Sequence, residues 1–201
     1  MGNTESSAQQ LPPLELVKNC DTSRFMGNWF VIGVKPTYLE TTCSNAVETY
    51  TRQNGSDANH DVHVDFSYNN KEPITSSLKS LTQKGWIQGK DKENSSSWVV
   101  SPFWPLKLDY PIIELEDKNY SYCVVGQQSR SYCWILSRKP FMPDAQYNDI
   151  IKTLRDKHRY DIDGFRKVPQ VWTKEERDKR GLTSKDIPDS FLTTLEDQSL
   201  N

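Results

Sequence analysis

The sequence predicts an all-β fold, a closed barrel or a sandwich, followed by one C-terminal helix. Roughly eight short segments with strand character precede the first segment with helical spacing. Alternation is clearest over residues 61–68, where valine and aromatic side chains share one face and polar side chains occupy the other. Turn residues separate such segments; Asn-Gly-Ser-Asp at residues 54–57 is typical of a hairpin.

The first strand is predicted to begin at Gly27 and to stop near Pro36. A glycine two residues before Trp29 indicates a close-packed start, and the β-branched and aromatic residues after it favour extended backbone. Apolar side chains fill both faces of this segment. We therefore interpret it as the first strand of a closed barrel, with Trp29 plugging one end.

Seven more strands are predicted at residues 46–52, 62–68, 74–90, 95–101, 109–115, 120–126 and 131–138. The alternation slips around residues 78–81, which predicts a bulge or two shorter pieces there. Tyr147, Ile150 and Leu154 then keep helical spacing, so this helix has one apolar face and should pack on the outside of the barrel.

The chain divides into a flexible leader at residues 1–21, a barrel with its helix at 22–170, and a charged extension at 171–201. Pro12 and Pro13 block regular structure in the leader. Thr173 and Glu176 have the spacing of a capping box, which predicts a short helix in the extension. Residues after 181 have little to bury and are expected to be loose.

Charge and hydropathy narrow the classes of partner. The 201 residues carry a net charge of −2, and residues 1–170 hold 20 basic and 20 acidic side chains. This balance gives no electrostatic footprint for nucleic acid. No apolar run approaches the roughly 18 residues of a membrane-spanning helix. The 6 tryptophans and 9 tyrosines suit a core or a ligand pocket with a few polar groups.

The first six residues, Met-Gly-Asn-Thr-Glu-Ser, match the pattern for N-myristoylation of Gly2, with a polar tail as the alternative. One acyl chain binds membranes only weakly, and no basic cluster supports it, so anchoring is expected to be reversible. We see no secretory signal and predict a cytoplasmic protein, peripheral on a membrane. The alternative is secretion, in which case the sequons at Asn54, Asn94 and Asn119 matter.

The sequence resembles the lipocalins over about residues 20–170, and most closely the outlier branch with apolipoprotein D, bacterial lipoprotein-type and plant temperature-induced lipocalins. The segments that carry the resemblance are residues 25–32, 109–115, 120–126, 132–140, 160–161 and 168–170, in the family's order. The resemblance implies an eight-stranded antiparallel up-and-down barrel with one C-terminal helix packed outside. It also implies that Arg138 packs on Trp29 and closes the floor beside Gly27, which is reasonable cation–π chemistry.

The chain departs from that branch in its cysteines. Cys20 and Cys43 stand at two family positions, but their usual partner positions hold no cysteine. A turn through residues 127–129 would set Cys123 opposite Cys133 and, on the other face, Tyr122 opposite Trp134. Two alternatives therefore remain for Cys123 and Cys133: a strained cross-strand disulfide, or two reduced thiols. The loss of the family bridges favours a reducing compartment.

A barrel of this size has room for one small ligand. Inward parity and the resemblance together predict that aromatic side chains line its pocket. These are Tyr50, Phe66, Tyr68, Trp98, Tyr110, Tyr122 and Trp134. The lining suggests a fatty acid, sterol, carotenoid or tetrapyrrole. The loops at residues 36–42 and 103–105 carry aromatics that either contact a bilayer or support the loops.

The leading hypothesis is therefore binding, transport or sequestration of a small hydrophobic ligand. The alternative is a lipocalin-type isomerase or de-epoxidase that acts through a thiol. In a third reading, the extension docks a partner. We predict no cofactor and no catalytic residue. We also predict no metal site, because Asp61, His63 and Asp65 all lie on the solvent face of one predicted strand.

Overall fold

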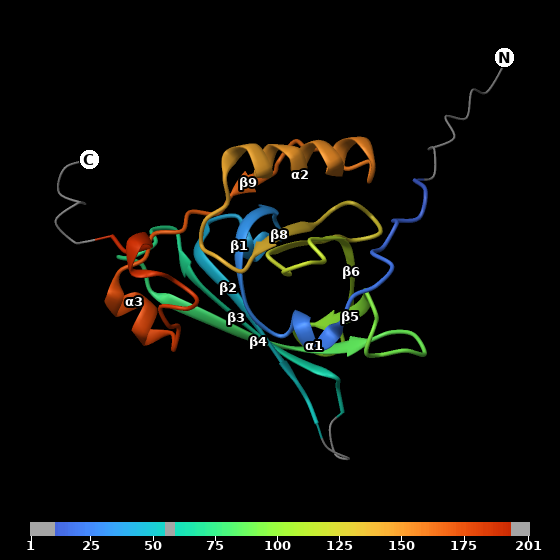
Figure 1. The fold of residues 1–201 in the computed structure, drawn as a ribbon, viewed down its shortest axis with the longest axis horizontal. Helices are drawn as coiled ribbons and strands as arrows, with labels where there is room; N and C mark the ends of the chain where they lie inside the picture. Colours follow the sequence, from blue (N-terminus) through green and yellow to red (C-terminus); the bar gives the residue numbers. More distant parts are fainter. Residues whose placement is uncertain (1–10, 55–58, 194–201) are drawn as a thin grey trace.

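Eight antiparallel strands close into a barrel in this computed structural model, which describes residues 11–54 and 59–193 (Figure 1). The barrel strands are β1 (Gly27–Lys35), β2 (Cys43–Arg52), β3 (Val62–Asn70), β4 (Leu78–Ile87), β5 (Ser97–Ser101), β6 (Leu108–Leu115), β7 (Tyr122–Val125) and β8 (Cys133–Ser137). Each strand pairs with the next, and β1 pairs with both β2 and β8, which closes the circle. The predicted up-and-down barrel is confirmed.

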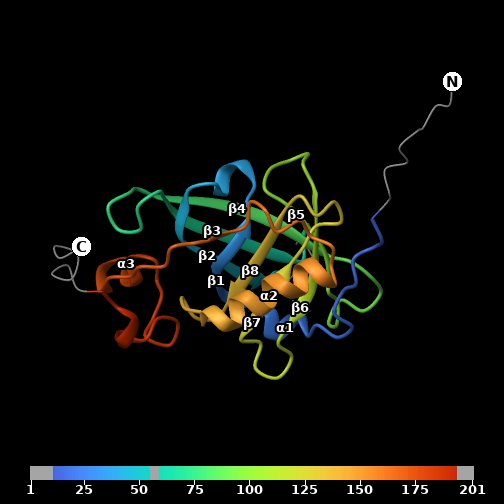
Figure 2. The same cartoon turned by 90° about the horizontal axis from the view of Figure 1, so that it is seen from above.

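Short elements surround the barrel. They are α1 (Thr22–Phe25), η1 (Tyr38–Glu40), α2 (Asp144–Asp156), β9 (Arg166–Lys167), α3 (Lys174–Lys179) and η2 (Asp189–Phe191). Helix α2 lies across the outer face of the barrel, and α3 lies at its side (Figures 1 and 2). Strand β9 pairs with β1 outside the closed circle. The predicted outer helix is therefore present, with Tyr147, Ile150 and Leu154 buried.

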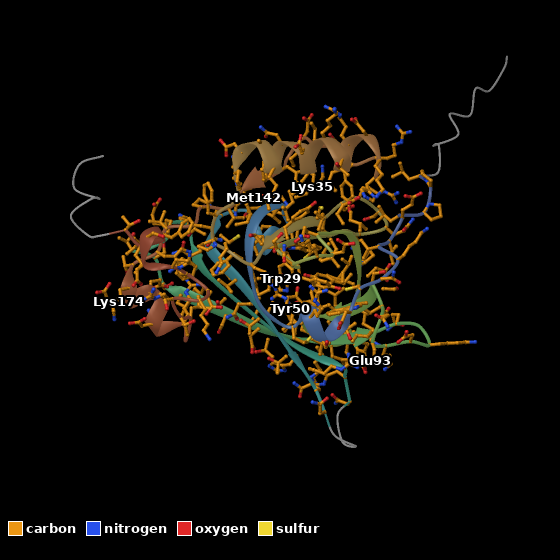
Figure 3. The ribbon with its side chains drawn as sticks, viewed as in Figure 1. Trp29, Lys35, Tyr50, Glu93, Met142 and Lys174 are labelled. Atoms are coloured by element: carbon orange, nitrogen blue, oxygen red, sulfur yellow. The ribbon has the colours of Figure 1, made fainter. Side chains whose placement is uncertain are left out.

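Two apolar clusters hold these layers together. One fills the barrel and includes Trp29, Tyr50 and Trp98, and the first two are seen inside it in Figure 3. The other lies between the barrel wall, α2 and the extension. A register shift in β1 between Val31 and Gly33 turns Gly33 toward α2. A Cβ at Gly33 would come within 2.6 Å of the Tyr147 ring, so only glycine allows this close approach.

The C-terminal extension is packed, which corrects the prediction that the chain is loose after residue 181. Ile187 is fully buried and Leu182 nearly so. Trp172 meets Phe30 of β1 edge-on at 5.8 Å between ring centroids. Arg180 lies 4.8 Å from the Trp172 ring and donates to the Asn45 carbonyl oxygen at 2.6 Å. Residues 171–193 therefore form part of the barrel's outer layer.

The described part of the leader is also fixed. The Val17 amide donates to the Ile112 carbonyl at 3.1 Å, and the Ser96 hydroxyl donates to the Val17 carbonyl at 2.7 Å. Leu14 and Cys20 are buried. Residues 11–21 thus run along the barrel, which corrects the flexible leader over that range. The predicted acylation site Gly2 lies outside the described residues.

The predicted interruption of the fourth strand is wrong. Strand β4 pairs with β3 without a register shift from Leu78 to Gly85. Leu78 pairs with Asn69 on the outer face, whereas Leu81 pairs with Phe66 on the inner face. The apolar Leu78 on the outside therefore produced the apparent slip in the alternation.

Candidate functional site

The barrel is sealed at one end by a layer of aromatic rings. Trp29 is fully buried, and its ring lies 5.0 Å from that of Phe25. The Arg138 guanidinium lies 3.7 Å from the centre of the Trp29 ring and donates to the carbonyl oxygens of Asn28 and Phe25. Gly27 opens β1 at a φ of +94°, a conformation that favours glycine. These contacts make a closed floor.

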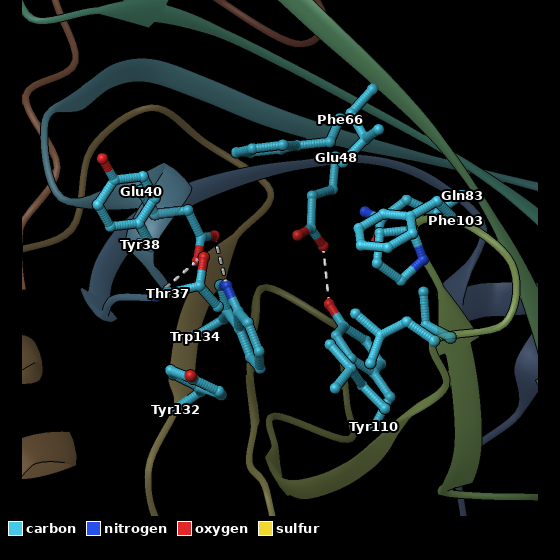
Figure 4. A pocket seen from close by; sticks show the side chains of 15 residues that line it. Thr37, Tyr38, Glu40, Glu48, Phe66, Gln83, Phe103, Tyr110, Tyr132 and Trp134 are labelled. Atoms are coloured by element: carbon cyan, nitrogen blue, oxygen red, sulfur yellow. Dashed lines mark hydrogen bonds between the residues drawn. The ribbon is translucent and has the colours of Figure 1, made fainter.

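Above this floor lies a cavity of about 350 Å³ (Figure 4). Its fifteen lining residues come from η1, from strands on both sides of the barrel and from the loop between β5 and β6. They are Thr37, Tyr38, Glu40, Glu48, Phe66, Leu81, Gln83, Val100, Pro102, Phe103, Leu106, Leu108, Tyr110, Tyr132 and Trp134. The wall is mostly apolar and aromatic, with few polar groups, which is the usual composition of a small-molecule site.

Glu48 of β2 is the most unusual group in this wall, because it is a carboxyl that is only 4% exposed. The Tyr110 hydroxyl donates to its Oε2 at 2.8 Å, and the Tyr50 hydroxyl donates to the same oxygen. Burial raises the pKa of Glu48 to about 7, against the lowering effect of the two tyrosines, and the nearby Glu40 raises it further. Burial also raises the pKa of both tyrosines well above the usual value.

Glu40 is the second buried carboxyl, and its role is to fasten η1 over the cavity. The Thr37 amide and hydroxyl donate to Oε2 at 3.1 and 2.7 Å. The indole nitrogen of Trp134 in β8 donates to Oε1 at 2.6 Å. Both Glu40 oxygens are thus engaged, and together they tie η1, at the open end of the barrel, to β8, the strand that pairs with β1.

Of the seven aromatic residues predicted to line the pocket, Phe66, Tyr110 and Trp134 line the cavity. Tyr50 and Trp98 lie in the aromatic layer below it, where each packs against Phe25. Tyr68 stacks on Phe66 at 4.9 Å and is partly buried against the barrel core. Tyr122 packs against the outer cluster instead, so its inward placement is wrong.

The reason for the error at Tyr122 is the register of β7 and β8. Tyr122 pairs with Ser137 and Val125 pairs with Trp134, a register shifted by three residues from the predicted one. The loop turns later than expected, at residues 127–130, where the Arg130 amide donates to the Gln127 carbonyl. An odd shift exchanges the two faces of a strand.

The same shift separates the two strand cysteines. Cys123 faces the barrel interior, whereas Cys133 belongs to the outer cluster, so they do not face each other. All four cysteines are buried and unbridged. Burial raises the pKa of Cys20 to about 12 and that of Cys43 to about 11, and it also raises the pKa values of Cys123 and Cys133. No cysteine lines the cavity of the described structure.

The two carboxyls of the wall were missed in the sequence. The signal for Glu48 was present, because Glu48 lies two residues from both Ala46 and Tyr50 and therefore shares their inward face. A charged residue at an inward position of a strand is unusual unless it has a partner. Glu40 lies in a loop, where alternation gives no information about direction.

Exposed aromatic side chains surround the mouth of the cavity. Tyr38 is 90% exposed, Trp104 77% and Phe103 62%, and Leu106 is also exposed.

Within residues 11–54 and 59–193, no helix has the length and apolar character needed to cross a membrane. The same residues hold no group of three or more His, Cys, Asp or Glu side chains arranged for a metal ion.

Comparison with known proteins agrees with this architecture. The family model for a lipocalin-like domain matches residues 20–170. Temperature-induced lipocalin-1 of Arabidopsis thaliana is 28% identical over 186 residues, covering 87% of this chain and 92% of that protein. The outer membrane lipoprotein Blc of Escherichia coli K12 is 26% identical over 166 residues, covering 82% of this chain and 85% of Blc.

Solved structures show the same fold at low sequence identity. Insecticyanin from the tobacco hornworm Manduca sexta superposes with a TM-score of 0.59 at 15% identity, covering 83% of this chain and 88% of insecticyanin. The cockroach allergen Per a 4 gives a TM-score of 0.54 at 14% identity, covering 81% of this chain and 97% of the allergen. Because the family model covers all eight strands of the closed barrel and the residues of its floor, the chain belongs to the lipocalin-like family.

Proposed function

We propose that this protein binds one small hydrophobic ligand in its barrel and carries or sequesters it. The observation that carries the proposal is the preformed cavity of about 350 Å³ above a closed aromatic floor. This volume lies at the lower end of the roughly 300–1,000 Å³ range of small-molecule sites. Among the fatty acids, sterols, carotenoids and tetrapyrroles that suit an aromatic wall, it favours a compact or slender ligand. Affinity would come mainly from removing apolar surface from water.

Ligand binding can be tested with N-phenyl-1-naphthylamine, a neutral probe that fluoresces in apolar surroundings. The wild-type protein is expected to bind one probe molecule, and Leu81→Trp, which fills part of the cavity, is expected to weaken binding about tenfold or more. Leu78→Trp is the matched control, because Leu78 lies on the outer face of the same strand. Absence of saturable binding, or equal loss in both variants, would contradict the proposal.

The positions of the thiols support binding over a thiol-dependent reaction. None of the four cysteines lines the cavity of the described structure, and burial raises the pKa values of all four, so the nucleophilic thiolate is disfavoured at neutral pH. All four are also unbridged, which supports our proposal of a reducing, cytoplasmic location over secretion.

We further propose reversible contact between the mouth of the barrel and a membrane surface. Support comes from Phe103 and Trp104, which are 62% and 77% exposed, and from the Lys107 ammonium 5.7 Å from the Trp104 ring. Aromatic and basic side chains together suit an interface with anionic lipids. Acylation of Gly2 would add a second, weak anchor.

The unacylated protein is expected to sediment with vesicles that contain phosphatidylserine, and Phe103→Ser with Trp104→Ser should reduce the bound fraction several-fold. The matched control is Phe141→Ser, because Phe141 is 55% exposed but pairs with Phe191 rather than lining the cavity mouth. An equal effect of the control would show that general surface hydrophobicity, and not the mouth, drives the association.

A further inference from the structure

We propose that the cavity selects ligands whose polar head donates a hydrogen bond, a hydroxyl or a protonated amine on an apolar body, with Glu48 as the acceptor. Ligands with an anionic head, such as a fatty acid carboxylate, are disfavoured. This inference rests on the proposed function, because it assigns the head-group chemistry of the ligand in the same cavity.

The charges in the wall carry the first step. Of the fifteen lining residues, Glu40 and Glu48 are the ones with ionisable acidic side chains, and none of the fifteen is lysine, arginine or histidine. An anionic head would therefore be taken out of water beside two carboxyls and without a cation to pair with. Burial of an unpaired charge is costly, and like charges add to that cost.

The hydrogen bonds identify which carboxyl meets the ligand. Both oxygens of Glu40 already accept hydrogen bonds, from Thr37 and from Trp134. Glu48 receives both of its hydrogen bonds at Oε2, and no residue of the described chain donates to Oε1. Figure 4 shows the Glu48 carboxyl projecting into the cavity between Trp134 and Tyr110. Oε1 is therefore free to accept from a molecule in the cavity, and a hydrogen-bond donor on the ligand would satisfy it.

The two tyrosines fix this acceptor in place. Tyr50 and Tyr110 lie 2.6 Å apart at their hydroxyl oxygens and hold Oε2 between strands on different sides of the barrel. Their hydroxyl protons are engaged there, so they are not free to donate to a ligand carboxylate. When Glu48 is ionised, the head site thus offers an acceptor at Oε1, and the hydroxyls of Tyr50 and Tyr110 are not available to an anion.

The protonation state of Glu48 adds a dependence on pH. The titratable groups that act on it are Tyr50, Tyr110 and Glu40, and burial brings its pKa to about 7. A fatty acid carboxylate and a primary amine both keep one charge between pH 6 and 8. The amine binds the ionised form of Glu48, so its affinity rises with pH. The carboxylate binds the protonated form, so its affinity should fall about tenfold between pH 6 and 8.

The experiment measures displacement of N-phenyl-1-naphthylamine by dodecylamine, 1-dodecanol and laurate, each below its aggregation concentration, from pH 6 to 8. At pH 8 the wild-type protein should bind the amine and the alcohol at least tenfold more tightly than laurate. Glu48→Gln should reduce the amine-to-laurate ratio at least tenfold and abolish the pH dependence of laurate binding.

The matched variant is Glu40→Gln, which removes a second carboxyl from the same wall. A glutamine there turns an amide donor toward Thr37 or Trp134, so η1 is held less firmly over the cavity. Affinity for all three heads should fall, least for laurate, while their order stays the same. The inference is overturned if laurate binds at pH 8 as tightly as the alcohol, or if Glu48→Gln leaves the order of the three unchanged. Probe binding distinguishes the two failures. If N-phenyl-1-naphthylamine binds but the order of the three heads is wrong, only this inference fails; if the probe does not bind, the proposed function fails as well.

Discussion

Replacing Trp29 by alanine is expected to lower the free energy of unfolding by about 3–5 kcal/mol, the scale of large aromatic truncations in a core. The side chain is fully buried, and its indole nitrogen donates to the Phe25 carbonyl at 2.8 Å. The Arg138 guanidinium rests on the same ring at 3.7 Å, so the change also removes a desolvated cation–π contact.

Urea unfolding followed by circular dichroism measures this loss. Trp104→Ala is the matched control, because Trp104 is 77% exposed and its truncation should change stability by about 0.5 kcal/mol or less. Where Trp29→Ala is still folded, the affinity for a ligand should change little, because Trp29 does not line the cavity. Equal losses in the two variants would contradict the assignment of Trp29 to a closed floor.

The barrel was predictable because local pattern and long-range pairing agree there. In β3 the alternation of Val62, Val64 and Phe66 against polar neighbours matches a strand with one buried face. Gly27 before Trp29 marked the start of β1 because a positive φ is required at that point. Each of these signals acts over a few residues, so the sequence displays it directly.

The placement of Tyr122 was not predictable, because it depends on a loop conformation. Arg130 has a φ of +59°, and its guanidinium donates to carbonyl oxygens of Pro12, Gln128 and His158. These contacts join three distant segments and hold the turn later than a minimal hairpin would place it. Since the side-chain period of a strand is two, an odd error in register exchanges its faces.

The packing of the extension escaped prediction for a related reason. Its apolar residues are sparse, and their burial depends on grooves that only the finished barrel provides. Trp172 lies against Phe30, and Ile187 is fully buried although it stands alone between Asp186 and Pro188 in the sequence. The composition of a segment shows how much apolar surface it has. It does not show whether the folded barrel offers a complementary surface on which the segment can pack.

The pocket was found from its aromatic residues and missed in its polar ones. Phe66, Tyr110 and Trp134 follow from parity, because aromatic side chains at inward positions belong to the interior. Glu48 has the same parity, but a carboxyl is normally assigned to solvent. Glu48 accepts hydrogen bonds from Tyr50, which lies on the same strand, and from Tyr110 of β6. The contact with Tyr110 depends on the closed barrel and cannot be read from the sequence.

The effect of Glu48→Gln on stability is expected to depend on pH, with a gain at alkaline pH and no gain at acid pH. The ordinary pKa of this carboxyl is 4.5, and burial raises it to about 7 in the folded protein. Between these values the folded state binds more protons than the unfolded state, so stability falls as pH rises through that window. Above pH 7 the wild-type protein retains a destabilising contribution on the order of 3 kcal/mol, which glutamine removes.

The variant should therefore be more stable than the wild type at pH 8, by an amount up to about 3 kcal/mol, and should match it or fall below it at pH 5. Urea midpoints at the two values measure the difference, with the exposed Glu72→Gln as the control that should change little at either. A difference that does not vary with pH would mean that Glu48 keeps one protonation state throughout. A pH-dependent difference would show that the cavity holds its acceptor at a cost in stability, one that a donating ligand can offset.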